Sequence, residues 1–133
     1  MTDVITFFVP GVPVPQGSKT LMRRGGKAWM VDANADALRE WRATVANRAD
    51  VGLTFDSPVV VGYEFLLPRP KRPKFLQHAV KPDLDKLIRA VNDGLVDGGL
   101  LSDDSRIFKF REPTKRYVDA GEQPGVHIHV EAW

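Results

Sequence analysis

Apolar and polar residues alternate with a period of two in several segments of the chain, and this pattern predicts β-strands. The clearest segment is 59–67, in which five apolar residues fall on one face: Val59, Val61, Tyr63, Phe65 and Leu67. Shorter apolar segments predict further strands over residues 4–9, 106–112 and 125–132.

Apolar residues at helical spacing predict two helices. The first covers residues 33–49, with Asp32, Asn34 or Asp36 as its N-cap and an apolar face formed by Leu38, Trp41, Val45 and Ala49. The second covers residues 82–97, between Pro82, which suits a first helical position, and the terminating pair Gly98 and Gly99. Its apolar stripe consists of Leu84, Leu87, Ile88, Val91 and Leu95.

These elements follow the order β-α-β-α-β-β, which indicates an α+β (mixed α/β) fold with about four strands and two helices. A chain of 133 residues fits one domain, which we expect to span residues 1–133. The pattern leaves the order of strands in the sheet open. Residues 10–28 and 68–81 are rich in proline and basic residues, and they are predicted to be basic loops.

Composition excludes several classes of protein and of site. The chain has no cysteine, so it forms neither disulfides nor thiolate metal sites. No apolar stretch approaches the roughly 18 residues of a membrane span, so we expect a cytoplasmic protein that does not enter a membrane. The segment GVPVPQGSKT lacks the spacing of a phosphate-binding loop, so no nucleotide cofactor is expected.

Charge is unevenly distributed, although the net charge is only +2. Residues 83–104 carry six Asp against Lys86 and Arg89, a net of −4, and the remainder carries a net of +6. A compact acidic segment in a basic chain suits a protein that holds metal ions against the phosphates of a nucleic acid. A solvated acidic helix on an ordinary surface is the alternative interpretation.

Two acidic motifs carry the candidate chemistry. KPDLDKL (residues 81–87) places Asp83 and Asp85 at the entry of the second helix, and LLSDDSRI (100–107) places Asp103 and Asp104 after it. Mg²⁺ prefers such oxygen ligands. Acidic residues also complement a helix dipole and favour turns, so each motif has an ordinary structural explanation. The two motifs can meet near one end of the helix or across a subunit interface.

The two motifs together resemble the signature of RusA-type Holliday-junction resolvases. KPDLDKLIRAVNDGL is followed by LLSDDSRI with 21 positions from Asp83 to Asp104, and FFVPGVPVPQGSK resembles the N-terminus of many members. The resemblance implies a RusA-like fold and a homodimer that cuts four-way DNA by paired nicks with Mg²⁺, or Mn²⁺ as a substitute. It implies that Asp83, Asp85 and Asp104 are metal-binding catalytic carboxylates.

The resemblance also concerns two basic residues of the same helix. The family's basic residue falls at Arg89, where some members have Lys, and Lys86 stands where others carry Asn. Either side chain can stabilise extra negative charge on the phosphate. Arg89 cannot donate a proton at neutral pH. Asp93 is a lesser catalytic candidate.

Basic residues outside the helix are candidates for DNA binding, with solubility as the alternative explanation. They form three groups: Lys71, Arg72, Lys74 and Lys81; Lys19, Arg23, Arg24 and Lys27; and Lys109 with Arg111. His127 and His129 share one face of the last strand, and we expect them to be polar surface residues rather than metal ligands.

Two other functions stay open at this point. The chain can be a metal-dependent nuclease of flap or branched DNA without junction specificity. It can also be a catalytically silent DNA-binding module whose acidic segment is structural.

Overall fold

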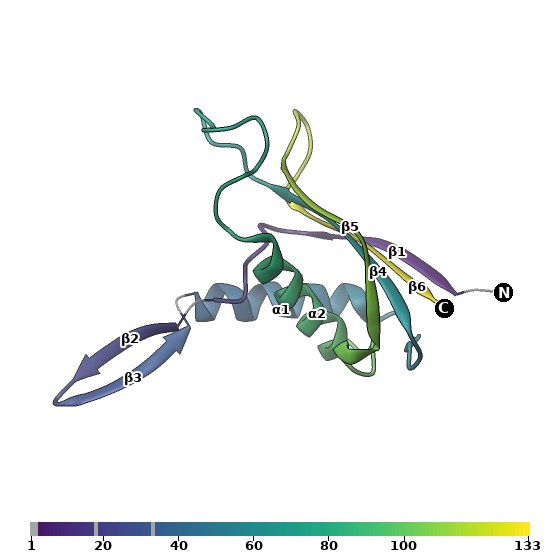
Figure 1. Ribbon diagram of the computed structural model, residues 1–133, viewed down its shortest axis with the longest axis horizontal. Helices are drawn as coiled ribbons and strands as arrows, with labels where there is room; N and C mark the ends of the chain where they lie inside the picture. The colour runs from purple at the N-terminus through teal and green to yellow at the C-terminus, as the bar shows by residue number, and fades with distance from the viewer. Residues whose placement is uncertain (1–2, 18, 33) are drawn as a thin grey trace.

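A computed structural model describes residues 3–17, 19–32 and 34–133 of the chain (Figure 1). Within them the element order is β1 (Val4–Pro10), β2 (Lys19–Arg24), β3 (Lys27–Asp32), α1 (Ala35–Ala49), β4 (Val59–Leu67), α2 (Leu84–Asp97), the 3₁₀ helix η1 (Asp104–Arg106), β5 (Ile107–Tyr117) and β6 (Gly125–Ala132). The predicted α+β class is confirmed.

Four strands form a mixed sheet in the order β1-β6-β4-β5. Strand β6 pairs antiparallel with β1 and β4, whereas β4 and β5 run parallel. Parallel neighbours need a crossover connection, and α2 provides it between β4 and β5. The four strands predicted from the alternating pattern are confirmed, and the third continues past residue 112 to Tyr117. This order leaves β5 at one edge of the sheet.

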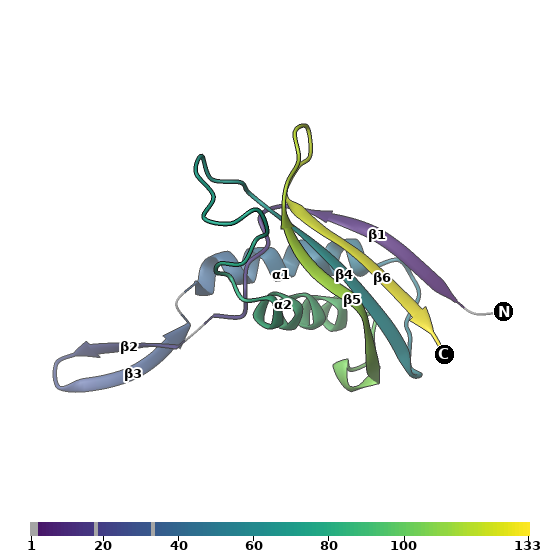
Figure 2. The same ribbon diagram turned by 45° about the horizontal axis from the view of Figure 1, so that its top comes forward.

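Both helices lie on the same face of the sheet (Figure 2). The predicted apolar face of α1 is buried, and β4 is buried along most of its length because it lies inside the sheet beneath the helices. Tyr63 on β4 donates a hydrogen bond to Asn92 on α2, and burial raises the pKa of Tyr63 well above its usual value. Among the described residues, no helix combines the length and the apolar character needed to span a membrane.

The beginnings of both helices differ from the sequence prediction. Helix α1 begins at Ala35 with Asn34 as its N-cap, whereas Asp32 ends β3 and residue 33 lies outside the described part of the chain. Helix α2 begins at Leu84 rather than at Pro82. The reason is the extended backbone of Asp83, the N-cap residue between Pro82 and Leu84, which has φ −69° and ψ 141°.

The prediction of a basic loop over residues 10–28 is wrong from Lys19 onward. Strands β2 and β3 pair there as an antiparallel hairpin, which forms a second sheet of its own. Gly25 and Gly26 occupy the turn with φ of 58° and 78°. Two positive φ values are the requirement of the tight two-residue turn that suits a hairpin, and glycine adopts them without strain.

Candidate catalytic site

The first acidic motif lies at the N-terminus of α2. Asp83 is the N-cap residue and Asp85 lies in the first turn, and both side chains are exposed. The Asp83 side chain makes no capping hydrogen bond to the helix. Its extended backbone also breaks the helical relation that would turn the two carboxylates away from each other. Helix capping therefore does not account for the Asp83 side chain.

Two cations of α2 lie close to this pair. The Lys86 Nζ atom is 3.7 Å from Oδ2 of Asp83. Arg89 is exposed one turn further along the helix, and within the described residues it forms no ion pair with Asp85. A surface ion pair between positions 85 and 89 is thus absent there. One carboxylate pair and two cations share the start of α2.

Lys115 on β5 holds the segment that leads to Asp83, although no pattern in the sequence indicated this role. Its Nζ donates hydrogen bonds to the backbone oxygens of Val80 at 2.6 Å and Pro82 at 2.8 Å. Burial lowers the pKa of Lys115, and the neighbouring Asp83 carboxylate opposes that shift. The sequence could not indicate these hydrogen bonds, because the one between Lys115 and Pro82 spans 33 positions and depends on the register of β5.

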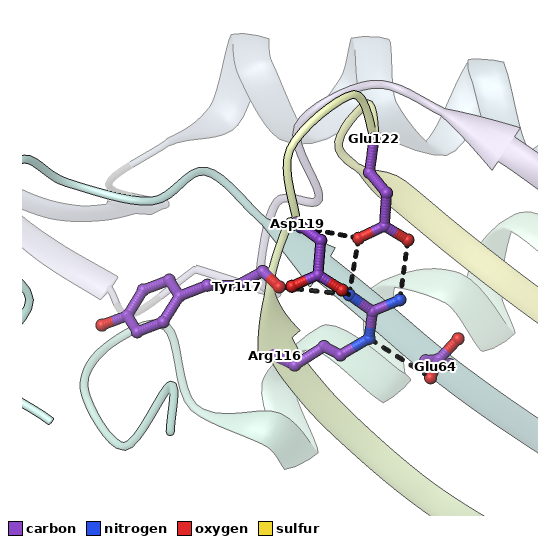
Figure 3. A network of polar contacts seen from close by, with 5 residues as sticks. All are labelled: Glu64, Arg116, Tyr117, Asp119 and Glu122. Carbon is purple, nitrogen blue, oxygen red and sulfur yellow. Dashed lines mark hydrogen bonds and ion pairs between the residues drawn. The ribbon is translucent and has the colours of Figure 1, made fainter. Parts of the chain in front are cut away.

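The end of β5 is fixed on the opposite face of the sheet by Arg116 (Figure 3). The guanidinium forms two hydrogen bonds with Glu122, at 2.7 and 2.8 Å, and a longer contact of 3.4 Å with Glu64 on β4. This bidentate pair lowers the pKa of Glu122 to about 2 and raises that of Arg116. The strand end that carries Lys115 is therefore tied to β4 and to the following turn.

A cleft of about 530 Å³ opens beside Asp83. Its walls come from the proline-rich segment, the start of α1 and the start of α2: Pro13, Val14, Pro15, Gln16, Gly17, Asn34, Ala37, Lys81, Pro82, Asp83 and Lys86. The Gln16 backbone N–H donates to the Lys86 carbonyl at 3.0 Å, which fixes the proline-rich segment against the helix. The cleft brings three separate parts of the chain to one carboxylate.

The second acidic motif lies at the other end of α2. Asp103 caps η1 by accepting hydrogen bonds from Ser105, and these bonds lower the pKa of Asp103. Asp104 is exposed, without a side-chain hydrogen bond to any other described residue. Helix α2 has 14 residues, so its two ends, near which the two motifs lie, are about 20 Å apart at 1.5 Å per residue. Of the two arrangements left open by the sequence, a meeting at one helix end is therefore wrong within one chain.

Asp93 and Asp97 have structural partners. Arg42 on α1 contacts Asp97 at 2.8 Å and Asp93 at 3.9 Å. These ion pairs connect the two helices far from the start of α2. They give both aspartates an ordinary role in helix packing.

The predicted DNA-binding residues fall in different places. Lys71, Arg72 and Lys74 are exposed in the loop between β4 and α2, and Lys81 lines the cleft. The second group lies on the hairpin, where the side chains of Arg23, Arg24 and Lys27 are exposed. Lys19 begins β2, and its side chain lies outside the described part of the structure. Both basic groups are therefore close in sequence to residues that line the cleft.

The third basic group, Lys109 and Arg111, lies on β5, and neither residue lines the cleft. The Lys109 Nζ atom lies 5.9 Å from the centre of the Trp133 ring. Arg111 contacts His129 at 3.1 Å and Glu131 at 3.7 Å on the sheet face away from the helices. His127 stacks obliquely on Phe8 on that same face. The two histidines thus have polar or aromatic contacts on this face of the sheet.

The donor atoms at the start of α2 suit a hard cation. Mg²⁺ takes oxygen ligands and commonly only one or two protein carboxylates. The exposed pair Asp83 and Asp85 fits this chemistry. Among the described residues, no cluster of three or more Asp, Glu, His or Cys side chains could hold a metal ion. Within one chain, the third candidate carboxylate, Asp104, therefore does not join this pair.

A comparison with protein families gives a match over most of the chain. The family model described as "Endodeoxyribonuclease RusA" matches residues 10–131 of the 133-residue chain. A search of curated proteins found no match.

Proposed function

The chain belongs to the RusA family of endodeoxyribonucleases, because the family model matches nearly the whole length of the chain. We propose that the protein resolves four-way DNA junctions by Mg²⁺-dependent paired cleavage. The observation that carries the proposal is the exposed pair Asp83 and Asp85 at the start of α2. Asp83 borders a cleft, and Lys86 and Arg89 follow on the same helix. Paired carboxylates next to cations are what hydrolysis of a phosphodiester needs.

The four residues divide into two pairs with different roles in this proposal. Asp83 and Asp85 would hold the metal ion at the start of α2. When bound, Mg²⁺ polarises the scissile phosphate and activates the attacking water. Lys86 and Arg89 stabilise the extra negative charge of the transition state. Arg89 acts by charge, because its guanidinium stays protonated at neutral pH.

We propose that a second copy of the chain supplies the third carboxylate. Strand β5 and helix α2 run in opposite directions. Lys115, near the end of β5, contacts the segment that precedes α2. The start of β5 follows the end of α2, with η1 between them. A two-fold axis through the middle of β5 would bring the partner's Asp104 toward Asp83. Phe108 and Phe110 on this edge strand are 55% and 47% exposed and would be covered by the partner.

The first test is cleavage of a synthetic four-way junction, a flap and a linear duplex with the same arms, in Mg²⁺, Mn²⁺ or EDTA. Wild type is expected to nick only the junction, symmetrically and only with metal. Asp83→Asn should slow cleavage about 100-fold or more while junction binding persists. The matched control Asp36→Asn, at an exposed position in the first turn of α1, should cut like wild type.

Each other outcome selects another function. Equal cleavage of all three DNAs would favour a metal-dependent nuclease without junction specificity. Folded wild type that binds DNA but cuts none of the substrates with either metal would contradict the enzyme and leave a DNA-binding module.

A mixture of two inactive variants tests the shared site. If each site combines Asp83 of one subunit with Asp104 of the other, a heterodimer of Asp83→Asn with Asp104→Asn has one site with both aspartates and one site with neither. The mixture should therefore regain nicking of one strand, which neither variant shows by itself. If each subunit carried its own site, every site would lack one aspartate and the mixture would stay inactive.

A further inference from the structure

The β2–β3 hairpin stands apart from the rest of the molecule. Figures 1 and 2 both show it extending away from the helices and from the four-stranded sheet. Each of its strands has six residues, so the hairpin reaches about 20 Å at 3.3 Å per residue. Every residue from Leu21 to Trp29 is exposed. This part of the hairpin therefore has no cover from the chain.

An isolated two-stranded ribbon is marginally stable in water. Met22 and Trp29 lie opposite each other across the strands and are 43% and 44% exposed. Such side chains favour contact with a partner that covers them. The ribbon thus has the features of a binding element rather than of a part of the core.

The charge of the ribbon indicates the chemistry of this partner. Arg23, Arg24 and Lys27 surround the turn, and residues 19–31 contain neither Asp nor Glu. Within the described part of the chain, these three side chains form no ion pair. Uncompensated cations on an exposed ribbon match a polyanion, and they attract it before contact.

The ribbon also starts at the candidate site. Its two ends lead to Gly17 and Asn34, which line the same cleft as Asp83 and Lys86. A DNA strand with its scissile phosphate at Asp83 would leave the cleft toward the base of the ribbon. The cleft and the ribbon can therefore contact one continuous piece of DNA.

We propose that the β2–β3 ribbon enters the major groove of the duplex arm next to the cleavage site. The inference rests on the proposed function, because it takes DNA as the substrate. The major groove of B-form DNA admits a two-stranded β-ribbon. Arg23, Arg24 and Lys27 contact the phosphates that border the groove, and Trp29 contacts the base edges. The ribbon orients the arm whose backbone is cut.

The test compares the double variant Arg23→Glu/Arg24→Glu with the matched control Arg39→Glu/Arg48→Glu, which reverses two exposed charges on α1. Binding to a four-way junction is measured in EDTA at several salt concentrations. Protection of guanine N7 from methylation is measured on the same complexes, because N7 lies in the major groove. Thermal melting verifies that each variant is folded.

Wild type should protect guanines in the arm next to the cut. The ribbon variant should lose this protection and bind about 10-fold to 100-fold more weakly at low salt, with a salt slope smaller by about 2 because two phosphate contacts are gone. Trp29→Ala should lose protection without a change in slope. The α1 control changes neither quantity.

The inference is overturned if the folded ribbon variant binds and protects the junction like wild type. Cleavage by wild type in Mg²⁺ is scored in parallel. If wild type cleaves the junction and the ribbon variant binds it as tightly as wild type, the ribbon's role is contradicted and the proposed function stays intact. Loss of protection in the ribbon variant, together with a wild type that cuts no DNA, would keep the ribbon's role and contradict the enzyme.

Discussion

At the residue scale, the position of the acidic motif depends on a side chain from another element. Asp83 follows a segment without regular structure, and Lys115 binds two backbone oxygens of that segment. Residues that orient metal ligands commonly change metal affinity or activity about 10-fold to 100-fold when they are removed. Lys115 is therefore a positioning residue for Asp83 in the proposed reaction.

Lys115→Met should raise the Mg²⁺ concentration for half-maximal cleavage about 10-fold, because Asp83 loses its fixed position. Junction affinity in EDTA should change little, since DNA binding without metal does not need this carboxylate. Hydrogen exchange over residues 79–86 should accelerate. Lys115→Arg, which keeps the charge and the donors, should restore part of the metal response. An unchanged Mg²⁺ titration in folded Lys115→Met would show that these bonds do not position Asp83.

The ion pair of Arg116 and Glu122 predicts a pH dependence of stability. The pKa of Glu122 is lowered from 4.5 to about 2 in the folded protein, chiefly by its hydrogen bonds with Arg116. A lowered carboxyl pKa stabilises the fold above the unfolded value, and the effect is lost as the pH falls toward the folded value. Glu122→Gln should thus lower the melting temperature at pH 7, and the difference from wild type should narrow below about pH 4.5.

Melting curves of both proteins from pH 7 to pH 2 measure this effect. Glu40→Gln, at an exposed position of α1, serves as the control and should follow wild type throughout. A difference between Glu122→Gln and wild type that stayed constant down to pH 2 would mean that the charge of Glu122 is not responsible.

At the scale of elements, the packing of α1 on α2 depends on small residues. A Cβ atom added at Gly98 would lie 2.3 Å from the Ala46 carbonyl oxygen, and one at Gly94 would lie 2.6 Å from a methyl carbon of Val45. The backbone contact cannot be relieved by a side-chain rotation. The two helices must therefore separate to accommodate a larger residue at position 98.

Gly98→Ala is expected to cost about 1–3 kcal/mol of unfolding free energy, as overpacking of a tight contact does. Urea unfolding measures it. The control is Gly99→Asn at the same helix end, where no atom lies within 4 Å of an added Cβ and φ is +81°. Asn tolerates this conformation, so its cost should be smaller. An equal or larger loss for the control would contradict the packing argument.

Burial explains why some elements were easier to predict from the sequence than the β2–β3 ribbon. Strand β4 and the apolar stripe of α2 show their burial in their residue pattern, and the bounds of β4 were predicted correctly. The β2–β3 ribbon is exposed on both faces from Leu21 to Trp29, so it has no burial pattern to detect. Its Gly25-Gly26 turn was the available signal, and the surrounding proline and basic residues indicated a loop instead.

The candidate site shows the same limit. The spacing of Asp83, Asp85 and Asp104 identified the acidic motifs without any structure. Their separation by the whole length of α2 became visible only from the fold, and so did Lys115, because both depend on how β5 pairs with β4. Local spacing indicated the candidate residues, whereas the register of the sheet decides which groups meet.

At the scale of the whole molecule, the separation of the two acidic motifs connects catalysis with assembly. Asp104 directly precedes the edge strand that carries Phe108, an exposed side chain whose ring contact is Trp133. A surface contact between two chains at this edge would bury both aromatic rings. It would also carry Asp104 across to the partner's site. The proposed reaction therefore requires the dimer for its metal site as well as for paired nicking.

Phe108→Asp should make the protein monomeric at concentrations where wild type is a dimer, because it places a charge in the contact between the chains. Sedimentation equilibrium measures the mass. Cleavage should fall together with the dimer, since Asp104 then reaches no partner. Val51→Asp, another exposed apolar position, should leave mass and cleavage unchanged. A Phe108→Asp variant that kept the dimer mass and paired nicking would place the contact between subunits elsewhere on the molecule.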